Sequence, residues 1–237
     1  MSQLLRQLRT IDLLEKFYIS SPYPQAFIQG FIKIELHHQT LFQTLISFIH
    51  HEVKQAKSPM HFRGNHFCIV VFQTHYSIKF TPELEQLRKT ALKLRMTKIP
   101  KSSLGQLTTT HPAFLPILRE VMREIYQSFD TFSEGFVYLL QVRFQSAYQY
   151  FPDEALKIAG DLFFLRILNP YLTHPNGLDP NELKDIVQIY RGIQKVVNGE
   201  YFEKCEGDVE PLNFGLTELI KNHRAFINQR LAPYYYF

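Results

Sequence analysis

Apolar residues recur along this chain at spacings of three and four, which is the pattern of helices that bury one face. No alternating pattern of any length suggests strands, although Cys68–Phe72 (CIVVF) is rich in β-branched residues. The hydropathy pattern therefore predicts an all-α, multi-helix fold. The apolar stripes cover residues 4–14, 27–32, 41–49, 84–94, 118–129 and 136–148.

Several short segments predict where helices begin and end. Thr81-Pro82-Glu83 combines a capping hydroxyl, a proline at the first helical position and an acid in the first turn. Residues 152–154 open a helix that Pro170 is expected to end, because proline cannot donate a backbone hydrogen bond. Residues 179–182 (DPNE) form a capping box, and Gly199 offers a matching helix terminator.

The composition is that of a globular protein. The chain has 237 residues, of which 45% are hydrophobic and 20% are charged, so it is too apolar and aromatic to be disordered. It contains only 10 glycines and no stretch that resembles a flexible linker. We therefore expect one domain over residues 1–237.

The charge balance does not identify a partner. The 26 Lys and Arg residues against 22 Asp and Glu give a net charge of +4, which is too weak for a dedicated nucleic-acid binder. Residues 88–101 hold six basic residues and no acid. We interpret them as a solvated helix face, with an anionic membrane or the acidic surface of a partner protein as the alternatives. The charged N-terminal segment does not resemble a signal peptide, and no apolar run is long enough to span a membrane. We expect a cytoplasmic protein whose membrane association is at most indirect or weak.

No residue pattern indicates a cofactor of its own. Cys68 and Cys205 have no disulfide or metal-ligand spacing, and the histidines between His50 and His75 are interpreted as scattered surface residues. The sequence also contains no GxxxxGK[ST] phosphate loop and no recognisable catalytic triad. We therefore expect no metal site and no bound nucleotide.

Two segments stand out from the helical background. Residues 61–65 (HFRGN) place Arg63 in a loop bounded by proline and glycine, where it projects from a rigid base, and Asn65 is expected to cap the next helix. Arg166 lies on an otherwise apolar helix just before Pro170. Burying an arginine is costly unless acceptors surround its guanidinium, so Arg166 is expected to have a specific structural task.

These two segments resemble the catalytic domain of the Ras GTPase-activating proteins. HFRGN is similar to that family's arginine-finger loop, and residues 163–170 (FFLRILNP) are similar to its FLR…P signature. Residues 148–160 and 185–202 resemble the helices that flank this signature. The strong part of the resemblance covers about residues 60–70 and 145–230.

The resemblance implies a GTPase-activating protein whose partner is a Ras-family small GTPase in the GTP-bound state, of the Ras, R-Ras or Rap type. GTP and Mg²⁺ would be carried by the partner. Arg63 would be the arginine finger, which supplies positive charge to the phosphates in the transition state. Arg166 would stabilise the finger loop. The GTPase-binding residues would be Phe62, Gly64, Asn65, Leu165, Asn169, Arg191, Gln194 and Asn198.

The chain departs from the family pattern in two places, and alternatives remain open. Met60-His61 stands where the family usually has Thr-Leu, and Tyr171 stands where it usually has a small residue. One alternative is a non-catalytic scaffold that binds GTP-loaded GTPases on the same fold. Another is a helical adaptor or membrane-surface module that uses residues 88–101. As a stand-alone copy of the domain, the chain also fits a bacterial effector that acts in the cytosol of a host cell.

Overall fold

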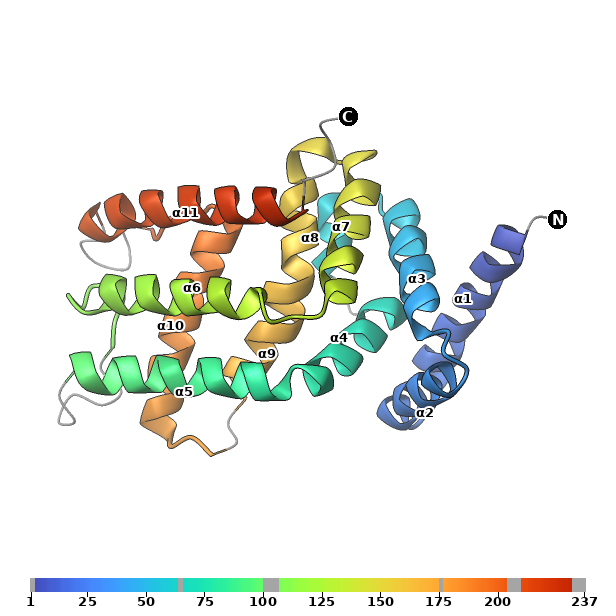
Figure 1. Cartoon of the computed structure of the whole chain (residues 1–237), viewed down its shortest axis with the longest axis horizontal. Coiled ribbons are helices and arrows are strands. Elements are labelled where there is room, and N and C mark those ends of the chain that lie inside the picture. The colour runs from blue at the N-terminus through green and yellow to red at the C-terminus, as the bar shows by residue number, and fades with distance from the viewer. Residues whose placement is uncertain (1–2, 64–65, 100–106, 175–176, 204–209, 232–237) are drawn as a thin grey trace. The chain divides into compact units, whose positions relative to one another are not determined.

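The structure is a computed structural model that describes residues 3–63, 66–99, 107–174, 177–203 and 210–231, without the side chains of residues 3–9, 60 and 63. Every regular element in these residues is a helix, which confirms the predicted all-α fold (Figure 1). The run Cys68–Phe72 is part of a helix as well. None of the described helices is both long enough and apolar enough to cross a membrane.

The α-helices are α1 to α11, and three short elements of other helical types are named η. Their bounds are α1 (Gln3–Ser20), α2 (Pro24–His37), α3 (Leu41–Gln55), η1 (Pro59–Arg63), α4 (Phe67–Lys79), α5 (Thr81–Lys98), α6 (Phe114–Phe129), α7 (Glu134–Tyr148), η3 (Pro152–Glu154), α8 (Ala155–Phe163), η4 (Phe164–Leu168), α9 (Asn169–Leu172), α10 (Pro180–Asn198) and α11 (Glu210–Leu231).

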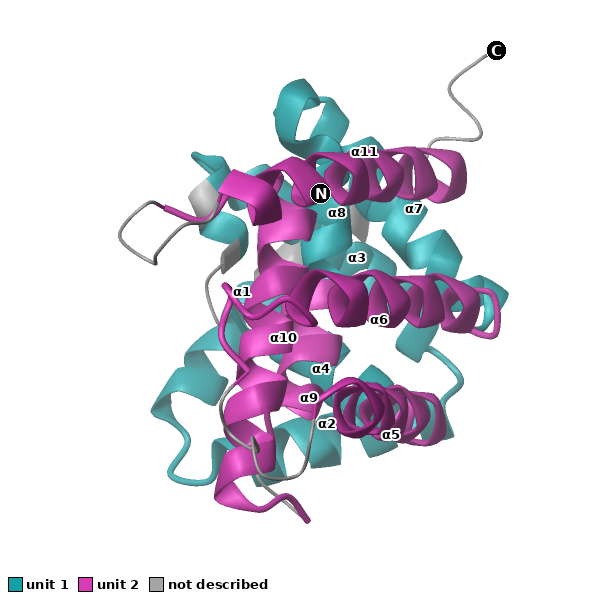
Figure 2. Ribbon diagram, turned by 90° about the vertical axis from the view of Figure 1, so that its left-hand side faces the viewer, with its two compact units in different colours: residues 1–79, 133–162 teal, residues 80–132, 163–237 magenta. Residues whose placement is uncertain are grey.

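The chain divides into two compact units, which Figure 2 shows in different colours. Unit 1 comprises Met1–Lys79 and Ser133–Leu162, and unit 2 comprises Phe80–Phe132 and Phe163–Phe237. Each unit is therefore built from segments that are far apart in the sequence. The prediction of one domain over residues 1–237 stays a prediction.

Unit 1 packs around Phe67, the first residue of α4. Helix α3 lies against α4 and α7, and α1 and α2 both contact α3 and α4. Phe67 is fully buried. Its ring centroid lies 5.4 Å from that of Phe31 and 5.6 Å from that of Phe48, and both pairs are edge to face. This geometry is favourable for aromatic pairs and fixes how α2 and α3 meet α4.

Unit 2 packs around α10, which contacts α5, α6 and α11 (Figure 1). The close approach of α10 to α6 depends on Gly192. A Cβ atom on this residue would lie 2.9 Å from side-chain carbons of both Phe114 and Leu118. A larger residue would force the side chains of Phe114 and Leu118, or the helices themselves, to shift, because this distance is shorter than a van der Waals contact.

The predicted ends of α10 are confirmed. The Asp179 carboxylate accepts hydrogen bonds from the N–H groups of Asn181 (2.7 Å) and Glu182 (2.9 Å), and the Glu182 carboxylate accepts from the Asp179 N–H at 3.1 Å. Gly199 has a φ of 68° and ends the helix in the left-handed region. At α5 the predicted cap is wrong: Thr81 is already the first helical residue, and Phe80 stands at the cap position without a side-chain hydrogen bond.

The prediction that Pro170 ends its helix is also wrong. The backbone widens into the π-helical segment η4 and then continues as α9. The N–H of Asn169 bonds to the carbonyl of Phe164, five residues earlier. In a regular α-helix the Pro170 ring would clash with the carbonyl of Arg166, and the wider π turn relieves this clash.

Candidate functional site: the loop after α3 and its support

The candidate finger loop leaves α3 through the 3₁₀ helix η1 and returns to α4 at Phe67. The N–H of His61 bonds to the carbonyl of Ser58 at 3.0 Å, which closes the turn that precedes Arg63. Arg63 is the last residue of η1. Its side chain lies outside the described part of the structure, as do Gly64 and Asn65. The roles predicted for these three residues stay predictions.

Phe62 anchors the loop in unit 1. Its side chain is only 3% exposed. The ring of Phe151 meets it edge to face, with centroids 5.8 Å apart, and the guanidinium of Arg143 lies 5.1 Å from its centroid. A cation over an aromatic face is attracted to the ring, more strongly when both are desolvated. The residue directly before Arg63 is therefore held in place, while the contact predicted between Phe62 and a GTPase stays untested.

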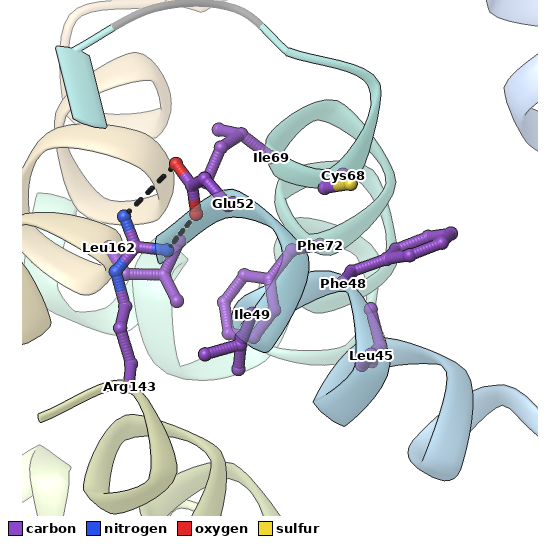
Figure 3. Close-up of a pocket in the computed structure, with 9 residues that line it drawn as sticks. All are labelled: Leu45, Phe48, Ile49, Glu52, Cys68, Ile69, Phe72, Arg143 and Leu162. Carbon is purple, nitrogen blue, oxygen red and sulfur yellow. Dashed lines mark hydrogen bonds and ion pairs between the residues drawn. The ribbon is translucent and has the colours of Figure 1, made fainter. Parts of the chain in front are cut away.

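Arg143 is itself held by a buried ion pair with Glu52, which joins α7 to α3 (Figure 3). Both side chains are at most 2% exposed. Both terminal nitrogens of the guanidinium donate to the Glu52 carboxylate, and Nε donates to the carbonyl of Ile158 at 3.0 Å. All the nitrogens of this guanidinium are thus paired, which a buried arginine requires. The pair connects three segments of unit 1 beneath Phe62.

A void of about 10 Å³ lies beside this ion pair, with Cys68 and Phe72 among its lining residues (Figure 3). This volume is about the minimum for one water molecule. Burial raises the pKa of the Cys68 thiol well above its usual value, so the thiolate needed for nucleophilic chemistry does not form at neutral pH. The cavity is a packing detail of the ion pair and offers no room for a substrate.

Three of the histidines between positions 50 and 75 are paired or buried, so the prediction that they are scattered on the surface is wrong for these three. The rings of His61 and His66 stack with centroids 4.3 Å apart, and Nδ1 of His66 lies 3.4 Å from the Glu15 carboxylate. His51 is buried, with Nε2 3.2 Å from the Asp12 carboxylate. Burial and then the neighbouring His66 lower the pKa of His61. Among the described residues no three His, Cys, Asp or Glu side chains gather as a metal site would require.

Arg166 is half-buried, which corrects the expectation that it is buried. It lies in the middle of η4, and π-helical turns inside helices are frequently found at functional sites. Arg166 belongs to unit 2 and Arg63 to unit 1. The role of Arg166 as a stabiliser of the finger loop therefore stays a prediction.

Unit 2 packs η4 and α9 against α10 and so brings two predicted binding segments onto neighbouring helices. Leu165 and Asn169 are half-buried on the first segment. On α10, Arg191 is exposed, with Nη1 3.3 Å from Oε1 of Gln188. Gln194 and Asn198 follow Arg191 at three and seven residues, so all three share one face of the helix.

Tyr171, the large residue where the family has a small one, interacts with α5. Its hydroxyl donates to the Glu85 carboxylate at 3.2 Å, and its ring centroid is 5.9 Å from the Arg88 guanidinium. Arg88 and Glu85 form an ion pair at 2.9 Å, so the three side chains make one network. Partial burial and Glu85 both raise the pKa of Tyr171, which keeps its hydroxyl a donor at neutral pH.

The interpretation of residues 88–101 as a solvated helix face is wrong at Arg95. Arg95 is 1% exposed, and its Nε lies 2.5 Å from Asp185 on α10. The other oxygen of the Asp185 carboxylate accepts from the N–H of Leu107 at 3.1 Å. With Arg88 in the network around Glu85, the exposed basic residues of this segment in the described part are Lys89, Lys93 and Lys98.

Sequence reasoning missed Glu52 and Arg143, although a signal was present. Arg143 follows Phe136 and Leu140 by seven and three residues, and Glu52 follows Leu45 by seven. Both charged residues therefore lie on the apolar stripe of their helix, where only a paired charge is tolerated.

Comparisons with known proteins give a distant and partial similarity. No family model matches the chain. It is 24% identical to the human Ras GTPase-activating-like protein IQGAP2 and 25% identical to the mouse protein of the same name, over 125 residues in each case. Each match covers 46% of this chain and 8% of the relative. The chain is thus distantly similar to a small part of a much longer Ras GTPase-activating-like protein.

Proposed function

We propose that this protein binds a Ras-type small GTPase in its GTP-bound state and accelerates GTP hydrolysis by inserting Arg63 into the partner's active site. The observation that carries the proposal is the position of Arg63 directly after the buried anchor Phe62, within the HFRGN motif. The partial similarity to a Ras GTPase-activating-like protein supports the same choice of partner. The partner's GTP and Mg²⁺ would complete the reaction site.

The physical basis is electrostatic. Negative charge that builds up on the phosphates in the transition state is incompletely neutralised in the GTPase alone, and an inserted arginine supplies the missing positive charge. Such a residue is worth about 10³ to 10⁵ in rate, or roughly 4 to 7 kcal/mol of activation free energy. A loop that is already fixed at its base loses less conformational entropy when the arginine enters the site. The contacts of Phe62 with Arg143 and Phe151 provide such a base.

The remaining predicted residues fit supporting roles within this proposal. Arg166 would stabilise the finger loop. The half-buried residues Leu165 and Asn169 and the α10 face of Arg191, Gln194 and Asn198 would contact the GTPase. Reversing the charge at Arg191, the exposed member of that face, should weaken binding of the GTP-bound partner, whereas Lys221→Glu on α11 should not.

The test is single-turnover hydrolysis by GTP-loaded Ras, R-Ras and Rap proteins, with and without this protein. We expect a rate increase of about 10³ or more on at least one GTPase, which Arg63→Ala abolishes while binding persists. Arg63→Lys should restore little, because lysine lacks the planar fork of arginine. Arg123→Ala is the matched control, because Arg123 is an exposed arginine that pairs only with Glu120 on its own helix among the described residues. Stimulation that survives Arg63→Ala would refute the assignment of the finger.

A non-catalytic scaffold is the second candidate, and the departures of Met60-His61 and Tyr171 from the family pattern favour it. Its signature is measurable binding to the GTP-bound form, little binding to the GDP-bound form, and an unchanged rate of hydrolysis across the whole panel. Arg63→Ala would then have no effect on any rate.

A further inference from the structure

An apolar groove of about 420 Å³ runs between α2 and α4 of unit 1. Ile32 forms part of its floor and is 7% exposed, whereas Leu36 and Ile78 on its walls are 50% and 67% exposed. Single exposed apolar side chains are ordinary, but here they converge on one concavity of the size that ligands and peptide side chains fill. The groove belongs to no part of the proposed GTPase site.

Positive charge borders this groove on both helices. Lys33 lies on α2 and Lys79 on α4. Lys79 donates to the Ser133 hydroxyl at 3.3 Å and lies 5.7 Å from the Tyr76 ring centroid, but neither lysine forms an ion pair within the described part of the chain. The carboxylate nearest to Lys33 in the sequence is that of Glu35, and it accepts hydrogen bonds from the hydroxyls of Thr40 and Thr44.

The other titratable group of the groove is His75. Burial and the neighbouring Lys79 lower its pKa, so the imidazole is uncharged at neutral pH. The groove therefore combines an apolar floor with two cations on opposite edges and no acid among its lining residues. A ligand complementary to this arrangement is apolar along its centre and acidic along its flanks.

We propose that the groove between α2 and α4 binds an acidic amphipathic helix of a partner protein. The groove walls follow α2 for about two helical turns, which matches the apolar anchors that a docked helix presents at i, i+4 and i+7. Acidic side chains beside these anchors would pair with Lys33 and Lys79. Such a site would recruit the protein to a partner independently of nucleotide hydrolysis.

The test uses the full chain and a library of helical peptides about sixteen residues long, with leucine at i, i+4 and i+7 and with Glu, Lys, Gln or Ala at the flanking positions. We expect selection for Glu at the flanks. The selected peptide should bind the Ile78→Gln variant about tenfold more weakly, because the lost burial of one isoleucine is worth about that factor. Ile34→Gln is the matched control, because Ile34 lies on α2, is 59% exposed and does not line the groove.

Charge reversal provides the second measurement. The K33E/K79E double variant should lose the selected acidic peptide and prefer the same peptide with Lys in place of Glu. The proposal is overturned if no peptide is selected, if basic or neutral flanks are selected, or if binding ignores both Ile78→Gln and the charge reversal. Binding to phosphatidylserine vesicles or self-association that depends on Ile78, without peptide binding, would also overturn it. Arg63→Ala should leave peptide binding unchanged, so failure of the proposed GTPase function would not affect this result.

Discussion

Among the described residues, each unit buries one arginine against one carboxylate, and the two pairs differ in what surrounds them. In unit 1, Arg143 on α7 pairs with Glu52 on α3, and in unit 2, Arg95 on α5 pairs with Asp185 on α10. All four side chains are at most 2% exposed. The chemistry is the same, and each pair joins two helices that are distant in sequence.

The two ion pairs differ in the further group that each one contacts. The guanidinium of Arg143 faces the ring of Phe62, one residue before Arg63, so that pair supports the candidate finger loop. In the other pair, Asp185 also accepts the N–H of Leu107 and holds the segment before α6. A buried ion pair therefore indicates no function by itself. The residue that it supports decides whether it contributes to a site or only to the fold.

Breaking either buried ion pair should destabilise the protein more than any other single substitution that we propose. Glu52→Ala and Asp185→Ala should each lower the free energy of unfolding by about 3–5 kcal/mol, because each leaves a buried guanidinium without its carboxylate. Urea unfolding at neutral pH measures both losses. The exposed pair of Arg119 and Glu218 is the control, and Glu218→Ala should cost less than about 1 kcal/mol. A similar small cost for all three variants would contradict the view that burial makes the difference.

Milder substitutions in the same pairs test whether only the pair beside Phe62 affects function. Arg143→Lys and Arg95→Lys keep the positive charge but lose the planar guanidinium. Under conditions where both variants are folded, Arg143→Lys should reduce GTPase stimulation by about tenfold or more, and Arg95→Lys should leave it unchanged. Equal losses in the two variants would show that the ion pair beneath Phe62 has no special relation to the loop.

The buried residue His223 in unit 2 should make the stability of the protein sensitive to acid. Burial, and then the neighbouring Arg224, lower the pKa of His223 to about 4, and the Tyr126 hydroxyl lies 3.2 Å from Nδ1. Between pH 6.5 and 4 the unfolded chain holds a proton at this position that the folded chain does not. The free energy of unfolding should therefore fall as pH drops through this window, by about 3 kcal/mol in total from His223.

The measurement is urea unfolding at several pH values, with His223→Gln as the variant, because glutamine stays neutral and still offers hydrogen bonds to Tyr126. The wild type should lose more stability than the variant between pH 6.5 and 4.5. In unit 1 the pKa of His61 is lowered as well, so a residual acid sensitivity in the variant is expected from the loop region. Parallel pH profiles for wild type and variant would exclude His223 as the source.

Removing the N-terminal cap of α10, the helix that carries Asp185, should cause the least loss of stability. Asp179→Ala removes the side-chain acceptor for two backbone N–H groups and should cost about 1 kcal/mol of stability. Asn181→Ala is the matched control, because the bond to Asp179 comes from the backbone of Asn181 and survives the change. Thermal unfolding of both variants measures the difference, and an equal shift would mean that the cap contributes nothing.

Local sequence patterns predicted much of the fold. They failed where contacts with other segments determined the local structure. The apolar spacing predicted the helices, and the capping box at Asp179 with its terminator Gly199 is confirmed. Pro170 was expected to end a helix, but a π-helical turn accommodates it, an option that residue preferences do not reveal. The candidate finger loop was predicted from its motif. Arg143, which supports the anchor Phe62, was missed because its partners Glu52 and Ile158 come from other segments.

The periodicity of apolar residues predicted the helices and their apolar stripes, because periodicity is a local property of the chain. It did not reveal that Glu52, Arg143 and Asp185 are buried, and it predicted a solvated face for the segment that contains Arg95. The packing of the helices sets which carboxylate each arginine pairs with, because the partners are 91 and 90 residues apart in the sequence. The same packing put Arg143 beneath Phe62, and so gave one of two chemically similar ion pairs a place at the candidate site.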